Sequence, residues 1–135
     1  MSQENVEIVR RGIAAFVVSE PPDVETMEEV LDPDCVLTTG WGVAATEHHG
    51  VQGYLTARAE MSAIWDSWQQ TVERVLDAGE EGVVALLRLR AEGRGSEVPV
   101  KSAWAMVVTL SNGRIVTSRA FPTHDEALKA VGLEE

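Results

Sequence analysis

The period of the hydrophobic residues changes once along this chain, near Trp68, and this change limits the possible folds more than any other feature. Before Trp68, apolar residues recur every three or four positions, which is typical of amphipathic helices. After it, they alternate with a period of two, which is typical of strands. Helices that are separated in sequence from an antiparallel sheet pack together on that sheet. We therefore expect an α+β fold with the helices on one sheet face.

Three helices are expected before the change. The first spans Glu4 to Val18, where the apolar residues form one stripe, and Pro21-Pro22 follows its end. Asp23 can cap a second, shorter helix, which Asp32-Pro33-Asp34 stops. The third and longest helix is expected from about Val51 to Trp68.

The remaining segments near the two ends of the chain are shorter. The stretch from Cys35 to Thr39 is rich in β-branched residues and predicts a brief strand. The stretch from Gly40 to Gly50 then predicts a loop. At the other end, Thr123 can cap a short terminal helix that Gly132 closes.

Four antiparallel strands are expected after the change in period. They are Gln69 to Asp77, Gly82 to Ala91, Val98 to Leu110 and Arg114 to Phe121. The Asn112-Gly113 pair between the last two suits the two positive φ angles of a type I′ hairpin turn. Such a turn places Ser111 opposite Arg114 and Ala105 opposite Ala120.

The strand from Val98 to Leu110 is apolar on both faces, since Trp104 and Met106 alternate with Ala105 and Val107. An antiparallel sheet with one wet face alternates apolar with polar residues. Its second face is therefore expected to pack on something, and a twin subunit is the simplest candidate. We predict a homodimer through the sheet face.

Charge, cysteine content and apolar runs exclude several classes of protein. The net charge of −11 repels a phosphate backbone, so no nucleic acid is expected as a partner. Cys35 is the only cysteine, which excludes an intrachain disulfide. The longest apolar runs, such as Val83 to Leu87, are too short for a membrane span. The first residues have no secretory pattern, so we expect a cytoplasmic protein. Its length of 135 residues is that of one domain, so we expect residues 1–135 to form a single domain.

Six short motifs, in this order, carry a resemblance that covers nearly the whole chain. They are Ser2-Gln3-Glu4-Asn5-Val6-Glu7-Ile8-Val9-Arg10-Arg11, Leu31-Asp32-Pro33-Asp34, the Gly50 start of a tryptophan-bearing helix, Leu87-Arg88-Leu89-Arg90, Asn112-Gly113-Arg114-Ile115-Val116, and Glu126-Ala127-Leu128-Lys129-Ala130-Val131-Gly132-Leu133. The chain resembles SnoaL-like proteins of the nuclear transport factor 2-like superfamily. The resemblance implies a cone-shaped, curved sheet around the long helix, with a pocket for small, mostly apolar ligands and no cofactor.

The enzymes of that superfamily do not transfer their mechanisms directly to this chain. Ketosteroid isomerases use one aspartate as base and a protonated aspartate as oxyanion donor. At the corresponding positions, the resemblance places Thr39 and Ala105. The Asp-Arg-Asp set of the epoxide hydrolases is not visible either, because the strands after Trp68 carry no aspartate beyond Asp77.

Two adjacent histidines are the candidate catalytic residues. His48 and His49 precede the third helix and lie near the mouth of a cone, and histidine is well suited to proton transfer near neutral pH. The alternative is a solvated pair with no role. No metal site is expected, since adjacent residues of an extended chain point to opposite sides and a third ligand is lacking.

Five other residues are candidates for ligand binding. Arg88 alternates with leucines and shares its strand face with Lys101, so the two could hold an anionic group, or could pair with acidic residues outside a pocket. Trp41, between two glycines, suits a lid. Arg58 lies on the apolar stripe of the third helix and either reaches solvent or faces the cavity. Trp65 on the same helix is either a ligand contact or core.

Together these features predict a protein that binds a small apolar molecule, with a histidine base for isomerisation, cyclisation or dehydration as the expected chemistry. The alternative is a non-catalytic binding module or a dimeric interaction module. An open pocket with at least two convergent polar groups distinguishes the first from the second.

Overall fold

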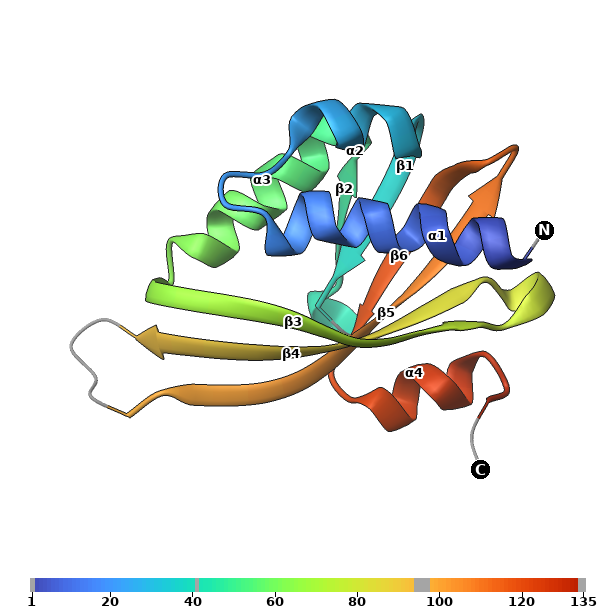
Figure 1. Ribbon diagram of the computed structural model, residues 1–135. Helices are drawn as coiled ribbons and strands as arrows, with labels where there is room; N and C mark the ends of the chain where they lie inside the picture. Colours follow the sequence, from blue (N-terminus) through green and yellow to red (C-terminus); the bar gives the residue numbers. More distant parts are fainter. Residues whose placement is uncertain (1, 41, 94–97, 134–135) are drawn as a thin grey trace.

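A computed structural model describes residues 2–40, 42–93 and 98–133 of the chain (Figure 1). In chain order the elements are α1 (Ser2–Ile13), the π-helical turn η1 (Ala14–Val18), α2 (Val24–Val30), β1 (Leu31–Thr39), η2 (Gly42–Ala44), β2 (Thr46–His49), α3 (Gly50–Ser62), β3 (Trp65–Asp77), η3 (Gly79–Glu81), β4 (Val83–Gly93), β5 (Val100–Ser111), β6 (Arg114–Phe121) and α4 (His124–Ala130). The expected order of helices and then strands is confirmed. Both expected N-caps form, because Asp23 accepts a hydrogen bond from the Thr26 amide and Thr123 accepts one from the Glu126 amide.

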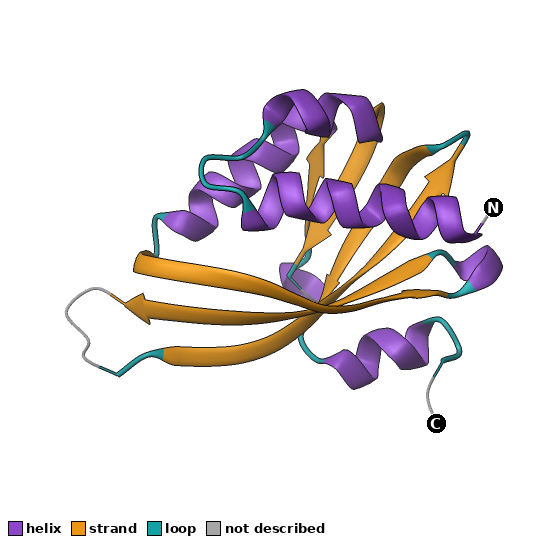
Figure 2. Ribbon diagram, viewed as in Figure 1, coloured by secondary structure: helices purple, strands orange, loops and turns teal. Residues whose placement is uncertain are grey.

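The strands form one curved sheet in the order β2-β1-β6-β5-β4-β3. All neighbouring pairs are antiparallel except β1 and β6, which run parallel. Helices α1, α2 and α3 lie on the concave face, whereas α4 lies alone on the convex face (Figure 2). This is the α+β cone that the sequence predicts. Among the described residues, no helix is long and apolar enough to cross a bilayer.

The second apolar face of the sheet is covered by the chain's own terminal helix. Val84, Leu86 and Ala105 point to the convex face and form a buried cluster with Ala127 of α4 and with Val131, which follows that helix. Burying such side chains is worth roughly 1.5 to 3 kcal/mol for each large one. The apolar face from which a twin subunit was predicted is therefore packed within one chain, at least where α4 lies. The dimer itself stays a prediction.

The third helix ends earlier than expected, because the three-residue spacing of Trp65 and Trp68 is not helical. Helix α3 stops at Ser62, and both tryptophans belong to β3. A bulge follows Trp65, so Trp65 pairs with Gly93 and Trp68 pairs with Ala91, two positions earlier on β4. The extra residue keeps the two rings on one strand face and thereby imitates a helical repeat.

The expected loop from Gly40 to Gly50 contains an edge strand. Residues Thr46–His49 form β2, which pairs with β1 so that Leu37 faces His48 and Val36 faces His49. Strand β1 is also longer than expected, since it begins at Leu31 and includes the Asp-Pro-Asp segment. The histidines are thus fixed on a strand.

The predicted pairing of the last hairpin is confirmed at its turn and is wrong further along the two strands. Asn112 and Gly113 have φ angles of 53° and 77°, and Ser111 pairs with Arg114. Ala105, however, pairs with Phe121 and not with Ala120. A register shift between Thr109 and Leu110 displaces the pairing by one residue, which the turn geometry alone does not reveal.

Candidate functional site

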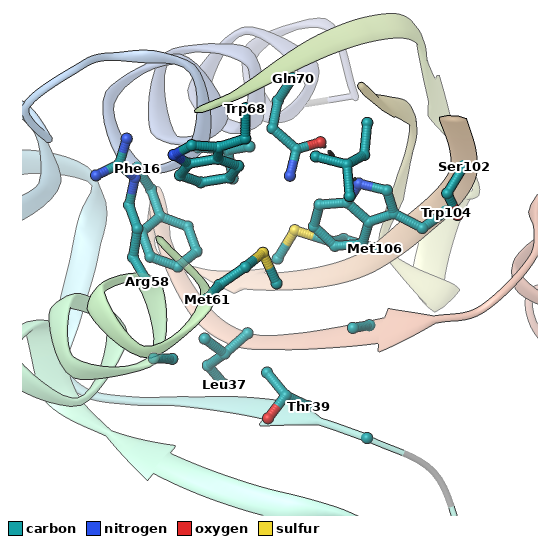
Figure 3. A pocket seen from close by; sticks show the side chains of 15 residues that line it. Phe16, Leu37, Thr39, Arg58, Met61, Trp68, Gln70, Ser102, Trp104 and Met106 are labelled. Atoms are coloured by element: carbon teal, nitrogen blue, oxygen red, sulfur yellow. Dashed lines mark hydrogen bonds between the residues drawn. The ribbon is translucent and has the colours of Figure 1, made fainter. Parts of the chain in front are cut away.

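A cavity of about 250 Å³ lies between the concave face of the sheet, η1 and α3 (Figure 3). Its lining residues are Phe16, Val17, Leu37, Thr39, Gly40, Ala57, Arg58, Met61, Trp68, Gln70, Leu89, Ser102, Trp104, Met106 and Ala120. Most of these side chains are apolar, and they come from η1, α3 and five strands of the sheet. The strand residues follow from the period of two, since alternate positions of β3, β4, β5 and β6 face the same side.

The π-helical turn explains how two consecutive residues reach the cavity. The Ser19 amide donates to the Ala14 carbonyl oxygen at 2.8 Å, which closes a five-residue turn. This wider turn buries both Phe16 and Val17, which both line the cavity. The Phe16 ring also packs edge-on against Tyr54, with 5.3 Å between the ring centroids. The turn therefore forms a rigid apolar wall.

Gln70 is a polar residue on the apolar wall of β3, and it is only 6% exposed. The Trp104 indole nitrogen donates a hydrogen bond of 2.9 Å to the Gln70 side-chain oxygen. The amide nitrogen of Gln70 points into the cavity (Figure 3). Sequence reasoning missed this residue, although a signal exists. Gln70 alternates with Trp68 and Val72, so it is the polar member of an otherwise apolar strand face.

Arg58 is 7% exposed and lines the cavity from α3. Its Nη2 atom donates to the Ser19 carbonyl oxygen at 2.8 Å and to the Glu20 carboxylate at 3.2 Å. Its guanidinium group lies 5.0 Å from the centre of the Trp68 ring, in cation–π geometry. Its Nε atom is buried and has no partner within the described part of the chain. Arg58 thus ties α3 to the segment after η1 and presents mainly its apolar stem to the cavity.

The two histidines have different neighbours. The Thr39 hydroxyl lines the cavity and lies 3.1 Å from Nε2 of His48. His49 points to the opposite side of β2, where its Nε2 atom lies 3.5 Å from the Glu47 carboxylate at an exposed position. A Cβ atom at Gly53 would lie 2.8 Å from the His48 carbonyl carbon, so α3 packs closely on this strand. Only His48 is connected to the cavity, through Thr39.

Arg88 and Lys101, two of the predicted ligand contacts, lie away from the cavity, whereas Arg58 lines it. Arg88 and Lys101 share a strand face, as expected, but it is the convex one, since their neighbours Leu89 and Ser102 line the cavity. There Arg88 forms an ion pair with Glu73. For Arg88, this is the alternative in which the basic residue pairs with an acidic residue outside a pocket.

Neither of the two tryptophan candidates is among the described residues that line the cavity. Trp65 packs near Gly93 at the start of β3 and is not among the lining residues. Trp41, the predicted lid, falls outside the described residues. Trp68 and Trp104 line the cavity in their place.

A buried hydroxyl network supports the wall from behind. The Tyr54 hydroxyl donates to the Ser118 hydroxyl at 3.0 Å. Burial raises the pKa of Tyr54 and also that of the Cys35 thiol, so both groups stay neutral near neutral pH. Among the described lining residues, no side chain is a carboxylate, and no described group of three His, Cys, Asp or Glu residues could hold a metal ion.

Comparisons with known proteins identify a domain family and a shared fold. The stretch 9–118 matches the SnoaL-like domain. Bal32a, from a soil-derived mobile gene cassette, is 25% identical with a TM-score of 0.72, and the match covers 88% of each chain. A putative SnoaL-like polyketide cyclase from Jannaschia sp. CCS1 is 18% identical with a TM-score of 0.75, covering 99% of this chain and 95% of that one.

A third structure shares the fold. An LEH-like epoxide hydrolase from M. tuberculosis is 17% identical with a TM-score of 0.63, covering 96% of this chain and 86% of that one. Among curated proteins, none matches this sequence. The structures below 25% identity show the fold alone, whereas the domain match spans most of the chain. The chain therefore belongs to the SnoaL-like domain family.

Proposed function

We propose that this protein binds a small, uncharged and largely apolar molecule in the cavity between η1, α3 and the sheet. The observation that carries the proposal is the lining itself, which combines apolar walls with a few polar side chains that converge on one space. Arg58 is the one charged residue in the described lining, and the Glu20 carboxylate lies 3.2 Å from it. The cavity therefore favours a neutral ligand over an anion.

A thermal-shift screen of small apolar compounds tests this proposal, because a ligand that binds only the folded state raises the melting temperature. The variant Ala57→Leu places a larger side chain in the cavity, whereas Ala59→Leu adds the same bulk at an exposed position of the same helix. We expect hits with the wild type and with Ala59→Leu, and we expect Ala57→Leu to weaken them by about tenfold or more. Equal shifts in all three proteins, or no hits, would overturn the proposal.

A second candidate function is cofactor-free proton transfer, as in an isomerase, cyclase or dehydratase. It is favoured by the Thr39–His48 hydrogen bond, which links a side chain in the cavity to a base outside it. In this mechanism neutral His48 accepts the hydroxyl proton of Thr39 while Thr39 removes a proton from the bound molecule. His49, which was predicted as an equal candidate, has no such link.

Hydrogen–deuterium exchange in the bound ligand distinguishes catalysis from binding alone. Compounds from the screen would be incubated with the protein in D₂O, and the loss of carbon-bound protons would be followed by ¹H NMR. A proton-transfer enzyme exchanges protons next to a carbonyl group, and His48→Gln stops the exchange while His49→Gln does not. Exchange at the uncatalysed rate in the wild type would leave the non-catalytic binding module as the function.

The homodimer through the sheet face is kept as a separate part of the proposal. Its support is now confined to the part of the convex face beyond α4, where Arg88 and Lys101 are exposed. Light scattering in dilute solution tests it, and the mass of a monomer would contradict it.

A further inference from the structure

We propose that Gln70, held by Trp104, selects ligands that carry a hydrogen-bond acceptor, such as a carbonyl oxygen, at one fixed point of an otherwise apolar body. The inference rests on the proposed function, because it concerns the same cavity. It adds which chemical group the cavity recognises and which residue recognises it.

The orientation of the Gln70 amide follows from the chemistry of its neighbour. An indole N–H group donates a hydrogen bond and accepts none, so the atom 2.9 Å from the Trp104 nitrogen must be the amide oxygen. The NH₂ group of Gln70 must then point the other way. That direction is the cavity, as Figure 3 shows. The bond to Trp104 therefore excludes the flipped orientation of the Gln70 amide, in which its NH₂ group and the indole N–H group would face each other.

The inward NH₂ group has no hydrogen-bond partner among the described residues. Gln70 is more than nine-tenths buried, so water reaches this group only through the cavity. A bound apolar molecule displaces that water, and a buried donor without a partner is costly. A ligand with an acceptor at this point replaces the lost hydrogen bond, whereas a purely apolar ligand leaves the donor unsatisfied.

Other polar groups of the lining are less suited to this role. The Arg58 Nε atom also has no partner in the described chain, but it is itself buried, so a ligand in the cavity as it stands does not reach it. The Thr39 hydroxyl interacts with His48 and can donate or accept. Among the described lining residues, Gln70 offers a donor that points into the cavity and whose direction is fixed by a second side chain.

A pair of isosteric ligands tests the inference by isothermal titration calorimetry. 2-Acetylnaphthalene carries a carbonyl oxygen where 2-isopropenylnaphthalene carries a methylene group, so the two differ in the acceptor and hardly in shape. We expect the wild type to bind the ketone more tightly. In Gln70→Met the order reverses, because the ketone oxygen is then desolvated without a donor, and the ratio of the two Kd values changes by about tenfold or more. Gln69→Met, at the exposed neighbouring position on the other strand face, keeps the wild-type ratio.

The part played by Trp104 has its own readout. In Trp104→Phe the amide of Gln70 is free to turn its oxygen inward, so the alcohol 1-(2-naphthyl)ethanol gains affinity relative to the ketone. A merely structural loss would weaken both ligands alike and leave their ratio unchanged. An unchanged ratio would overturn the positioning role of Trp104.

The outcomes separate this inference from the proposed function. If the wild type binds the ketone no better than the alkene, the inference fails while the cavity remains a binding site. This comparison needs no variant, so it holds even if Gln70→Met does not fold. If neither probe binds and the thermal-shift screen also gives no hits, both the proposed function and the inference are overturned.

Discussion

The Thr39 hydroxyl and the His48 imidazole lie 3.1 Å apart, across the pairing of β1 with β2. Leu37 is directly opposite His48 and Thr39 is directly opposite Thr46, so the bond is a diagonal contact between β1 and the edge strand β2. It joins the inside of the cavity to a half-buried histidine outside it. The proposed proton transfer uses this contact as its path toward solvent.

Replacing Thr39 with valine tests whether this contact controls the histidine. Valine keeps the shape of the side chain and removes the hydroxyl, so Nε2 of His48 loses its partner. We expect the tautomer equilibrium of His48 to change, because the hydrogen bond at one ring nitrogen fixes where the proton sits. Two-dimensional ¹H–¹⁵N NMR of the imidazole nitrogens measures the change. His49, on the other side of β2, is the internal reference, and equal changes at both histidines would contradict the prediction.

Tryptophan fluorescence can report which rings face the cavity. Trp68 and Trp104 line it, whereas Trp65 packs over Gly93 outside it. We expect a non-fluorescent ligand from the screen to change the emission of the wild type and of Trp65→Phe. The change should fall by about half in Trp68→Phe or in Trp104→Phe and should nearly vanish in the double variant. An unchanged signal in the double variant would place the ligand elsewhere.

The fold was largely predictable from the sequence, because alternation and turn chemistry are local signals. The strands after Trp68, the Asn112-Gly113 turn and both capped helices follow from such signals. The end of α3 could not be predicted in this way, since a bulge after Trp65 gives the tryptophans of a strand the spacing of a helix. Similarly, β2 is a short exposed edge strand whose pairing with β1 leaves little trace in composition.

The site was less predictable, because the sequence gives the period of a strand and not which of its faces is concave. Arg88 and Lys101 were correctly placed on one face, but that face is the convex one. Gln70 was missed because its neighbours in sequence, Gln69 and Thr71, make it look like part of a polar run. Its significance depends on Trp104, which is 34 positions away in sequence.

Arg58 is expected to stabilise the fold mainly through its stem. In Arg58→Met the apolar stem is retained and the buried Nε donor without a described partner is removed, so the unfolding free energy should fall by less than about 1.5 kcal/mol. In Arg58→Ala the stem is lost as well, and a loss of about 2 to 4 kcal/mol is expected. Urea denaturation measures both. Glu20→Gln is the control, because its exposed carboxylate contributes at most about 1 kcal/mol.

If both Arg58 variants lower the free energy of unfolding by the same amount, the guanidinium group and its bond to the Ser19 carbonyl oxygen stabilise the fold, and the stem contributes little. The segment after η1 would then depend on that bond. A large effect of Glu20→Gln would point to the ion pair instead.

Tyr54 should make the fold sensitive to alkali. Burial raises the pKa of its hydroxyl above the ordinary value of 10.0, so the folded state holds this proton more tightly than the unfolded chain does. The resulting stability is fully present below about pH 10 and is lost as the pH rises toward the folded-state pKa. The slope reaches about 1.4 kcal/mol per pH unit for one group.

The variant Tyr54→Phe isolates this effect when both proteins also carry Cys35→Ala, which removes the neighbouring thiol. Near pH 8 the phenylalanine variant should be less stable by about 1 kcal/mol, because it lacks the hydrogen bond to Ser118. Above pH 10 the difference should shrink and then reverse, since phenylalanine has no proton to lose and the other titrating groups are common to both proteins. Urea denaturation at a series of pH values measures the two curves. Parallel curves would mean that the Tyr54 hydroxyl ionises equally well in the folded and unfolded chain, and the wall behind the cavity would then be open to water.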